Sequence, residues 1–138
     1  MDFLLCKPDH YGINYSINLW MDISNSADVI KAKQQWDCLD KKIKELGANV
    51  VYVDPVKDLP DMVFTANAAL LLTNKDVYIS KFKHSERSHE EKYFRSWFEN
   101  NGYNILDTNE YFEGAGDALY FGPNLVGGHG FRSEKSFY

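Results

Sequence analysis

The sequence predicts an α/β fold within one domain over residues 1–138, and three observations support this fold class. Two segments repeat apolar residues at the three- and four-residue spacing of an amphipathic helix. Short apolar runs with the length of strands lie before, between and after these segments. The same order of elements also occurs twice: a helix, a strand, a polar loop, and two strands joined by a turn.

The first half of the chain begins with a predicted strand over residues 3–6, followed by an irregular segment. The first helix is predicted to have Ser26 as its N-cap and to stop at Gly47. A strand over residues 49–54 follows it. The apolar residues on one face of the helix are Val29, Trp36, Leu39, Ile43 and Leu46.

The second helix is predicted to begin at the segment SHEE, because Ser88 and Glu91 have the spacing of a capping box. It stops at Gly102, and a strand over residues 103–106 follows. Its aromatic residues turn inward, so that we expect the core aromatics of the two helices to be Trp36, Tyr93, Phe94, Trp97 and Phe98.

Each half ends in two predicted strands joined by a tight turn. The first pair covers residues 68–73 and 76–80, with Asn74-Lys75 as its turn. The second pair covers residues 118–122 and 124–128. The two halves therefore have the same architecture without having the same sequence.

A polar loop precedes each pair of strands. Asn67 closes the first loop and Asp117 closes the second, and the second helix begins about 60 residues after the first. If the two units are related by rotation about an axis, both loops point to the same place. The side chains expected to converge there are Asp61, Asn67, Glu113 and Asp117.

The composition argues against several classes of protein. A net charge of −5 and a pI near 5.3 do not fit a nucleic-acid-binding surface. No apolar run approaches the roughly 20 residues that a membrane span needs, and the acidic N-terminus does not resemble a signal peptide. Cys6 and Cys38 form neither a disulfide framework nor a metal-binding spacing. We expect a cytoplasmic protein with no metal and no cofactor.

Converging carboxylates and an amide, with no cluster of histidines beside them, favour a planar cation as ligand. A guanidinium group offers five N–H donors in a rigid fork that matches carboxylate geometry. The residues therefore predict a small guanidino substrate that resembles arginine.

The residues alone leave simpler roles open. Asp61 follows Pro60 and could serve as a turn or cap residue. Asn67 and Asp117 could satisfy backbone groups where strands begin, and Glu113 could be a solvated loop residue. A lone arginine such as Arg132 is most often a surface charge.

Five motifs occur in order along nearly the whole chain: LLCKPDHYGINYSINLWM, LPDMVFTANAAL, FKHSERSHEEKYFRSWFENNGY, FEGAGDAL and GHGFRSE. Together they resemble the N-terminal half of the guanidino-group-modifying enzymes of the pentein superfamily. The resemblance is greatest to the arginine dihydrolase and dimethylargininase branches. It implies a fivefold pseudosymmetric α/β propeller, built of repeated strand–helix modules, with residues 1–138 as its N-terminal portion.

The resemblance also implies roles for six residues. Acidic residues of the family hold the guanidinium nitrogens, which assigns Glu113 and Asp117 to the catalytic pocket together with Asp61 and Asn67. Asn18 resembles a second pocket asparagine, and Arg132 resembles the arginine that steadies the substrate, through its α-carboxylate.

Asn67 stands where the deiminases and dimethylargininases of this superfamily usually have aspartate. This departure favours the dihydrolase reaction, in which arginine is hydrolysed twice to ornithine, carbon dioxide and ammonia. Leu19 and Ala69 stand where proline and glycine are usual, and neither change removes a functional group.

The nucleophilic cysteine and the proton-shuttling histidine of the family correspond to positions beyond Tyr138. One hypothesis is therefore that the chain is the binding part of a guanidine hydrolase. The alternative is a short, non-catalytic protein that binds guanidino ligands or a partner, as an obligate oligomer or complex that covers its open sheet edges. A third, an interaction module like the ribosome anti-association factors of this fold, fits the acidic motifs less well.

Overall fold

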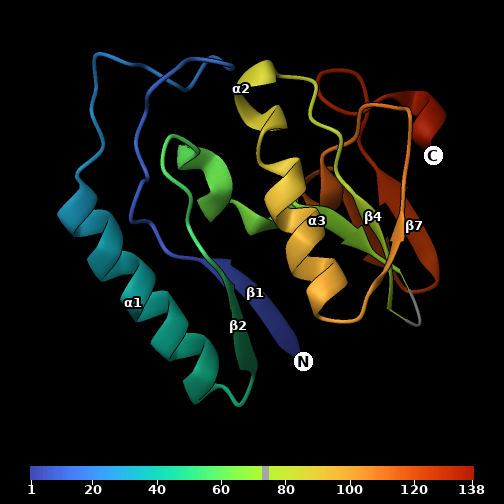
Figure 1. Cartoon of the computed structure of the whole chain (residues 1–138), viewed down its shortest axis with the longest axis horizontal. Helices are drawn as coiled ribbons and strands as arrows, with labels where there is room; N and C mark the ends of the chain where they lie inside the picture. Colours follow the sequence, from blue (N-terminus) through green and yellow to red (C-terminus); the bar gives the residue numbers. More distant parts are fainter. Residues whose placement is uncertain (73–74) are drawn as a thin grey trace. The chain divides into compact units, whose positions relative to one another are not determined.

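The computed structural model describes residues 1–72 and 75–138, which form two compact units, Met1–Thr65 and Ala66–Tyr138 (Figure 1). Helices and strands alternate in both units, as the α/β prediction requires. Asn74 of the predicted turn lies outside the described residues.

The first unit is built on a pair of parallel strands, β1 (Asp2–Cys6) and β2 (Asn49–Val53), in which Phe3 lies opposite Val50. Parallel strands cannot be joined by a hairpin, so the chain must cross over between them. Helix α1 (Val29–Glu45) forms that crossover and lies against β2 (Figure 1).

Helix α1 differs from its prediction in its cap and in its apolar face. Asp28, not Ser26, is the N-cap, and its carboxylate accepts a hydrogen bond from the backbone N–H of Lys31. Gly47 ends the helix with a φ of +81°, as predicted. No residue of α1 is fully buried: Trp36 and Ile43 are half-buried, whereas Val29, Leu39 and Leu46 are exposed.

The second unit contains a sheet with the strand order β3-β4-β5. Strands β3 (Ala69–Leu71) and β4 (Asp76–Ile79) pair antiparallel, as predicted for two consecutive strands. Strand β5 (Asn104–Leu106) pairs with β4 in parallel, so the segment between them must also cross over.

Two helices make this second crossover, where the sequence predicted one. A short helix α2 (Ser85–Ser88) precedes α3 (Glu91–Asn100), whose N-cap is Glu90 without a side-chain cap bond. The predicted capping box is therefore wrong, because Ser88 ends α2 and the carboxylate of Glu91 accepts a hydrogen bond from Phe82 N–H. Phe94 and Phe98 are buried as predicted, whereas Tyr93 and Trp97 are half-buried.

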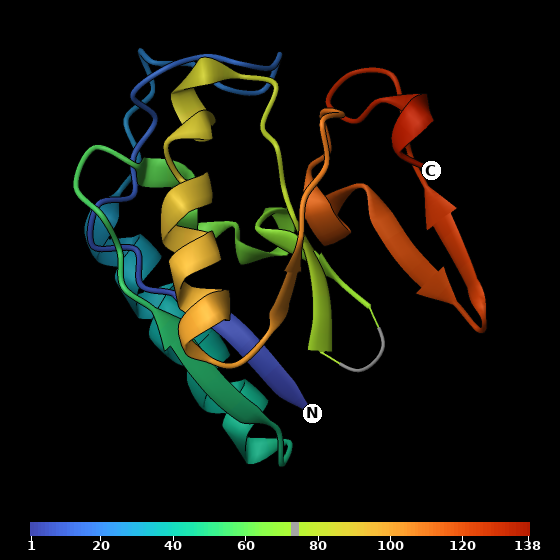
Figure 2. The same cartoon turned by 45° about the vertical axis from the view of Figure 1, so that its right-hand side comes forward.

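The chain ends with the hairpin of β6 (Ala118–Phe121) and β7 (Asn124–Gly127), followed by the short turn η5 (Lys135–Phe137) (Figure 2). Leu70, Phe112 and Ala118 form a buried cluster in this unit, and the Phe137 ring stacks on Phe112 at 3.8 Å. Phe137 thus adds to the core next to the loop over residues 113–117.

Within the part of the chain that the structure describes, no helix has the length and apolar composition of a membrane span. Cys6 is buried and Cys38 is exposed on α1, and the two form no disulfide with each other.

Candidate functional site

Glu113 and Asp117 flank a single turn of 3-10 helix, η4 (Gly114–Gly116), directly before β6. Gly114 has a φ of +61°, and a β-carbon there would lie 2.8 Å from the Ala66 carbonyl oxygen. Glycine is therefore required at this position by both conformation and space. The tight turn brings two carboxylates, four residues apart, into one cluster.

The Glu113 side chain is the buried member of this cluster, at 1% exposure for the residue. Its Oε2 lies 3.3 Å from Arg132 Nη1 and 3.9 Å from Arg87 Nη1. Its Oε1 is buried and has no hydrogen-bond partner among the described residues. Burial raises the pKa of Glu113 above the ordinary value of 4.5, and the charges of Arg132 and Arg87 oppose this rise.

Asp117 uses both of its carboxylate oxygens. Oδ1 pairs with Nη2 of Arg132, and Oδ2 accepts a hydrogen bond of 2.7 Å from the Ser133 hydroxyl. The Ser133 hydroxyl in turn accepts the backbone N–H of Glu113 at 3.1 Å. Ser133 therefore ties the two acidic residues together, with its side chain buried.

The guanidinium of Arg132 thus lies between the two carboxylates, with one nitrogen directed to each. Its side chain is 39% exposed, so the cluster is closed on the side of Glu113 and open on the side of Arg132. We refer to Glu113, Asp117, Arg132 and Ser133 as the carboxylate site.

Asn67 reaches the same loop from the segment before β3. Its Nδ2 donates a hydrogen bond of 3.3 Å to the backbone carbonyl of Glu113. A β-carbon on Gly116 would lie 2.3 Å from that nitrogen, so the Asn67 amide fills the space above Gly116. Asn67, Glu113, Asp117 and Arg132, predicted as site residues, are therefore gathered within the second unit.

A buried ion pair supports the carboxylate site. Arg87 donates from Nε and Nη2 to the two oxygens of Glu90, at 3.0 and 2.8 Å, and its guanidinium lies 4.4 Å from the centre of the Phe82 ring. Both charged residues are buried. This pair was not predicted from the sequence, because burial depends on tertiary packing.

The other two predicted residues belong to the first unit. Asp61 is buried in the 3-10 turn η1 (Pro60–Val63), and its backbone carbonyl accepts the N–H of Phe64 at 3.0 Å. Asn18 is exposed, and its Oδ1 accepts the backbone N–H of Trp20 at 2.9 Å. Their roles in substrate binding remain predictions.

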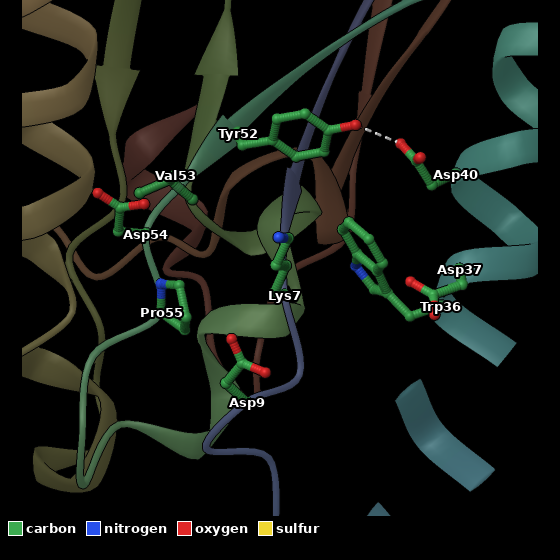
Figure 3. Close-up of a pocket in the computed structure, with 9 residues that line it drawn as sticks. All are labelled: Lys7, Asp9, Trp36, Asp37, Asp40, Tyr52, Val53, Asp54 and Pro55. Carbon is green, nitrogen blue, oxygen red and sulfur yellow. Dashed lines mark hydrogen bonds between the residues drawn. The ribbon is translucent and has the colours of Figure 1, made fainter. Parts of the chain in front are cut away.

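The first unit also has an open groove of about 510 Å³ that the sequence did not predict (Figure 3). Trp36, predicted as core, lines it beside Tyr52, whose hydroxyl donates to Asp40 at 2.6 Å. Asp40 also pairs with Lys44, and Asp9 pairs with Lys33, both at 2.8 Å. Because none of the six predicted site residues lines it, the groove is a weaker candidate than the carboxylate site.

Among residues 1–72 and 75–138, no group of His, Cys, Asp and Glu side chains has the arrangement of a metal site. Glu113 and Asp117 instead pair with the guanidinium group of Arg132.

A family model described as N,N dimethylarginine dimethylhydrolase, eukaryotic, matches residues 8–121. The chain belongs to this family. The chain is similar to several curated proteins. One is the bifunctional arginine dihydrolase/ornithine cyclodeaminase ArgZ of Synechocystis sp., which is 48% identical over 136 residues. The alignment covers 95% of this chain and 19% of ArgZ. The N(G),N(G)-dimethylarginine dimethylaminohydrolase of Mycobacterium tuberculosis is 34% identical over 133 residues, covering 96% of this chain and 44% of that protein.

Several solved structures have a fold similar to that of this chain. The N-terminal domain of ArgZ bound to substrate has a TM-score of 0.91 at 46% identity, with 98% of this chain and 51% of that chain covered. AgrE is a bifunctional arginine dihydrolase/ornithine cyclodeaminase of Nostoc sp.. Its structure in complex with L-arginine has a TM-score of 0.93 at 46% identity, covering 99% of this chain and 21% of that chain. A dimethylarginine dimethylaminohydrolase adduct, at 16% identity and a TM-score of 0.75, has the same fold over 97% of this chain. The chain spans about half or less of each of these proteins.

Proposed function

We propose that residues 1–138 form the N-terminal, substrate-binding portion of a guanidine hydrolase that acts on arginine or a methylated arginine. The observation that carries this proposal is that Glu113 and Asp117 already bind a guanidinium group, that of Arg132. A pair of carboxylates that holds one guanidinium has the spacing and charge to hold another.

The state of Glu113 supports the same conclusion. Its buried Oε1 has no hydrogen-bond partner among the described residues, and such an oxygen is costly unless a donor reaches it. A substrate guanidinium, with five N–H donors, supplies donors for Oε1 and for the oxygens of Asp117 at once. Glu113 and Asp117 are thus the proposed catalytic acids, with Asn18, Asp61, Asn67 and Arg132 as substrate-binding residues.

The proposed reaction is the dihydrolase reaction. Arginine and two molecules of water give ornithine, carbon dioxide and two molecules of ammonia. ArgZ and AgrE are named arginine dihydrolases, and both are more similar to this chain than the dimethylarginine dimethylaminohydrolase of M. tuberculosis. Asn67, in place of the aspartate usual in deiminases and dimethylargininases, supports the same choice.

The proposed mechanism is covalent, with a cysteine thiolate and a proton-shuttling histidine supplied from outside residues 1–138. The thiolate forms a bond to the guanidinium carbon, and the histidine gives its proton to the nitrogen that leaves as ammonia. A water molecule then replaces the remaining amino group on the sulfur-bound carbon and releases the second ammonia. A second water molecule breaks the carbon–sulfur bond, which regenerates the thiolate, and the carbamate that forms breaks down to ornithine and carbon dioxide. Structures of an ArgZ cysteine-to-serine variant with substrate and of an asparagine-to-serine variant covalently bound to a reaction intermediate support this scheme.

The proposed architecture is the α/β propeller of the pentein superfamily. Its support is the recurring order of elements, in which α1 and β2 precede β3 and β4, and α3 and β5 precede β6 and β7. In such a propeller the loops that carry Asp61, Asn67, Glu113 and Asp117 would meet near the axis.

A chimeric enzyme tests the proposal. Residues 1–138 replace the matching segment of the ArgZ N-terminal domain, and ornithine, citrulline and ammonia are measured after addition of arginine or dimethylarginine. We expect ornithine and ammonia from arginine, and no turnover in the Glu113→Gln variant of the chimera. A folded chimera that hydrolyses neither substrate would overturn the proposal.

A further inference from the structure

Ser80 is a buried polar residue outside the six predicted site residues. It follows β4 directly, it is 2% exposed, and its backbone N–H donates to the Ala68 carbonyl oxygen at 3.0 Å. Its hydroxyl oxygen is buried and has no hydrogen-bond partner among the described residues. A buried hydroxyl group without a partner is costly, so the presence of serine at this position needs a reason.

Backbone pairing places Ser80 across from Glu113. Lys81 and Phe112 form an antiparallel bridge in which they exchange two backbone hydrogen bonds, of 2.9 and 3.0 Å. Ser80 precedes Lys81 and Glu113 follows Phe112, so Ser80 and Glu113 lie opposite each other beside the bridge. Side chains in such a pair project to the same face, with β-carbons about 4.5–5.5 Å apart.

The contacts of Arg87 agree with this placement. Phe82 lies two residues after Ser80, so its side chain projects to the same face as that of Ser80. The guanidinium carbon of Arg87 lies 4.4 Å from the centre of the Phe82 ring, and its Nη1 lies 3.9 Å from Glu113 Oε2. Phe82 and Glu113 therefore face the same guanidinium group.

The two carboxylate oxygens of Glu113 have different surroundings. Oε2 lies 3.3 Å from Arg132 Nη1 and 3.9 Å from Arg87 Nη1. Oε1 is buried and, within residues 1–72 and 75–138, has no hydrogen-bond partner. A buried hydroxyl group and a buried carboxylate oxygen thus occupy one face without a direct bond between them. Buried water molecules commonly join polar groups of this kind.

We propose that Ser80 is a positioning residue for Glu113, joined to its Oε1 through one buried water molecule. The water molecule accepts a hydrogen bond from the Ser80 hydroxyl group and donates one to Oε1. The link fixes the plane of the carboxylate and leaves a second lone pair of Oε1 for an N–H group of the substrate. This inference rests on the proposed function, which gives Glu113 its place in the substrate pocket.

The competing explanation is that position 80 needs only a small side chain. In that case Ser80→Ala removes a hydroxyl group that contributes nothing to Glu113, and the ionisation of Glu113 is unchanged. The two explanations therefore differ in whether the hydroxyl group of Ser80 influences the protonation of Glu113.

Ser80→Ala should make Glu113 harder to ionise. A hydrogen bond donated to a carboxylate favours its charged form, so removal of this link should raise the pKa of Glu113 above that in the unchanged protein. The charged and titratable groups that act on Glu113 are the same in both proteins: Arg132, Arg87, Asp117 and His84.

Carbon-13 nuclear magnetic resonance of the side-chain carboxyl groups measures this difference in the 138-residue chain. The signal that is missing in Glu113→Gln identifies Glu113. Ser80→Thr, which keeps the hydroxyl group, should leave Glu113 close to its titration in the unchanged protein. Ser96→Ala is the matched control, because Ser96 is an exposed serine on α3.

The pH profile of the chimeric enzyme provides a second readout. For Ser80→Ala, kcat/KM for arginine should fall about tenfold or more at the acidic end of the profile, the effect of one charge-assisted hydrogen bond. The loss should be smaller at alkaline pH, where Glu113 is charged in both enzymes. A purely structural effect would lower kcat/KM equally at every pH.

The outcomes separate the role of Ser80 from the proposed function. If Glu113 titrates at the same pH in Ser80→Ala and in the unchanged protein, or if the loss of kcat/KM is equal at every pH, the positioning role is overturned. If the chimera hydrolyses no guanidino substrate while Ser80→Ala still shifts the titration of Glu113, the proposed function fails and the link between Ser80 and Glu113 stands.

Discussion

Asn67 donates a hydrogen bond from Nδ2 to the backbone carbonyl of Glu113 across 3.3 Å. The bond joins the segment before β3 to the loop before β6, so the two polar loops of the second unit hold each other in place. The same nitrogen lies where a β-carbon on Gly116 would come within 2.3 Å. The position of the Asn67 amide, which we propose to bind substrate, therefore depends on the absence of a side chain at Gly116.

Gly116→Ala should displace the Asn67 amide and lower kcat/KM of the chimeric enzyme by about tenfold or more, because small displacements in a binding site are costly. Gly128→Ala is the matched control, since its β-carbon would meet only the Asp117 carbonyl oxygen, at 3.7 Å. The loss should vanish in an Asn67→Ala background, where the alanine at position 116 has no amide to displace. Fully additive losses in that double-mutant cycle would contradict the explanation.

Asn67→Asp should shift the product of the chimeric enzyme from ornithine toward citrulline. The carboxylate cannot donate to the Glu113 carbonyl, and it adds a negative charge beside the acidic cluster. Chromatographic separation of ornithine and citrulline measures the ratio directly. Unchanged ornithine formation would remove the reason for choosing the dihydrolase reaction over the deiminase reaction.

Gly114→Ala should reduce the free energy of unfolding by about 2 kcal/mol or more, because the new methyl group meets three backbone atoms at 2.8–2.9 Å at a φ of +61°. Gly122→Ala separates the cost of the positive φ from the cost of the close contacts, since Gly122 has a φ of +60° but no atom within 4 Å of its β-carbon. We expect it to cost about 1 kcal/mol. Urea denaturation measures both, and equal losses would mean that the close packing around Gly114 contributes nothing.

Most helices and strands follow from the sequence because each has a local signal. The strands lie within two or three residues of their predicted ends, and both glycines that stop a helix have positive φ. The predicted N-caps of the two helices were wrong because several residues near each helix start have side chains that can act as a cap. Asp28 is as suitable a cap residue as Ser26 and lies closer to the first residue of α1. The carboxylate of Glu91 accepts a hydrogen bond from the backbone N–H of Phe82 and does not cap α3.

The candidate site was predicted only in part. Asn67, Glu113, Asp117 and Arg132 were singled out from their motifs, and the structure places them together in one unit. Ser133 was missed although it follows Arg132 directly, because a serine has many uses and no spacing pointed to Asp117. The buried pair of Arg87 and Glu90 was missed since a local sequence does not reveal which face of a short helix is covered.

Glu90→Ala should reduce the free energy of unfolding by about 3 kcal/mol or more, because it removes the bidentate partner of a buried guanidinium. Arg95→Ala, which breaks partly exposed ion pairs with Glu99 and Asp107, should cost about 1 kcal/mol or less. Denaturation of both variants at one pH provides the comparison. A loss in Glu90→Ala no larger than in Arg95→Ala would show that Arg87 tolerates losing this partner.

Glu113 should make stability depend on pH in a predictable direction. Since burial raises its pKa above 4.5, the folded protein holds this proton more tightly than the unfolded chain does. Its contribution to stability is complete below pH 4.5 and is lost as the pH rises through the raised pKa. The unfolding free energy of the wild type minus that of Glu113→Gln should therefore fall as the pH rises above 4.5. A difference that rises with pH would mean that Arg132 and Arg87 stabilise the charged carboxylate by more than its burial costs.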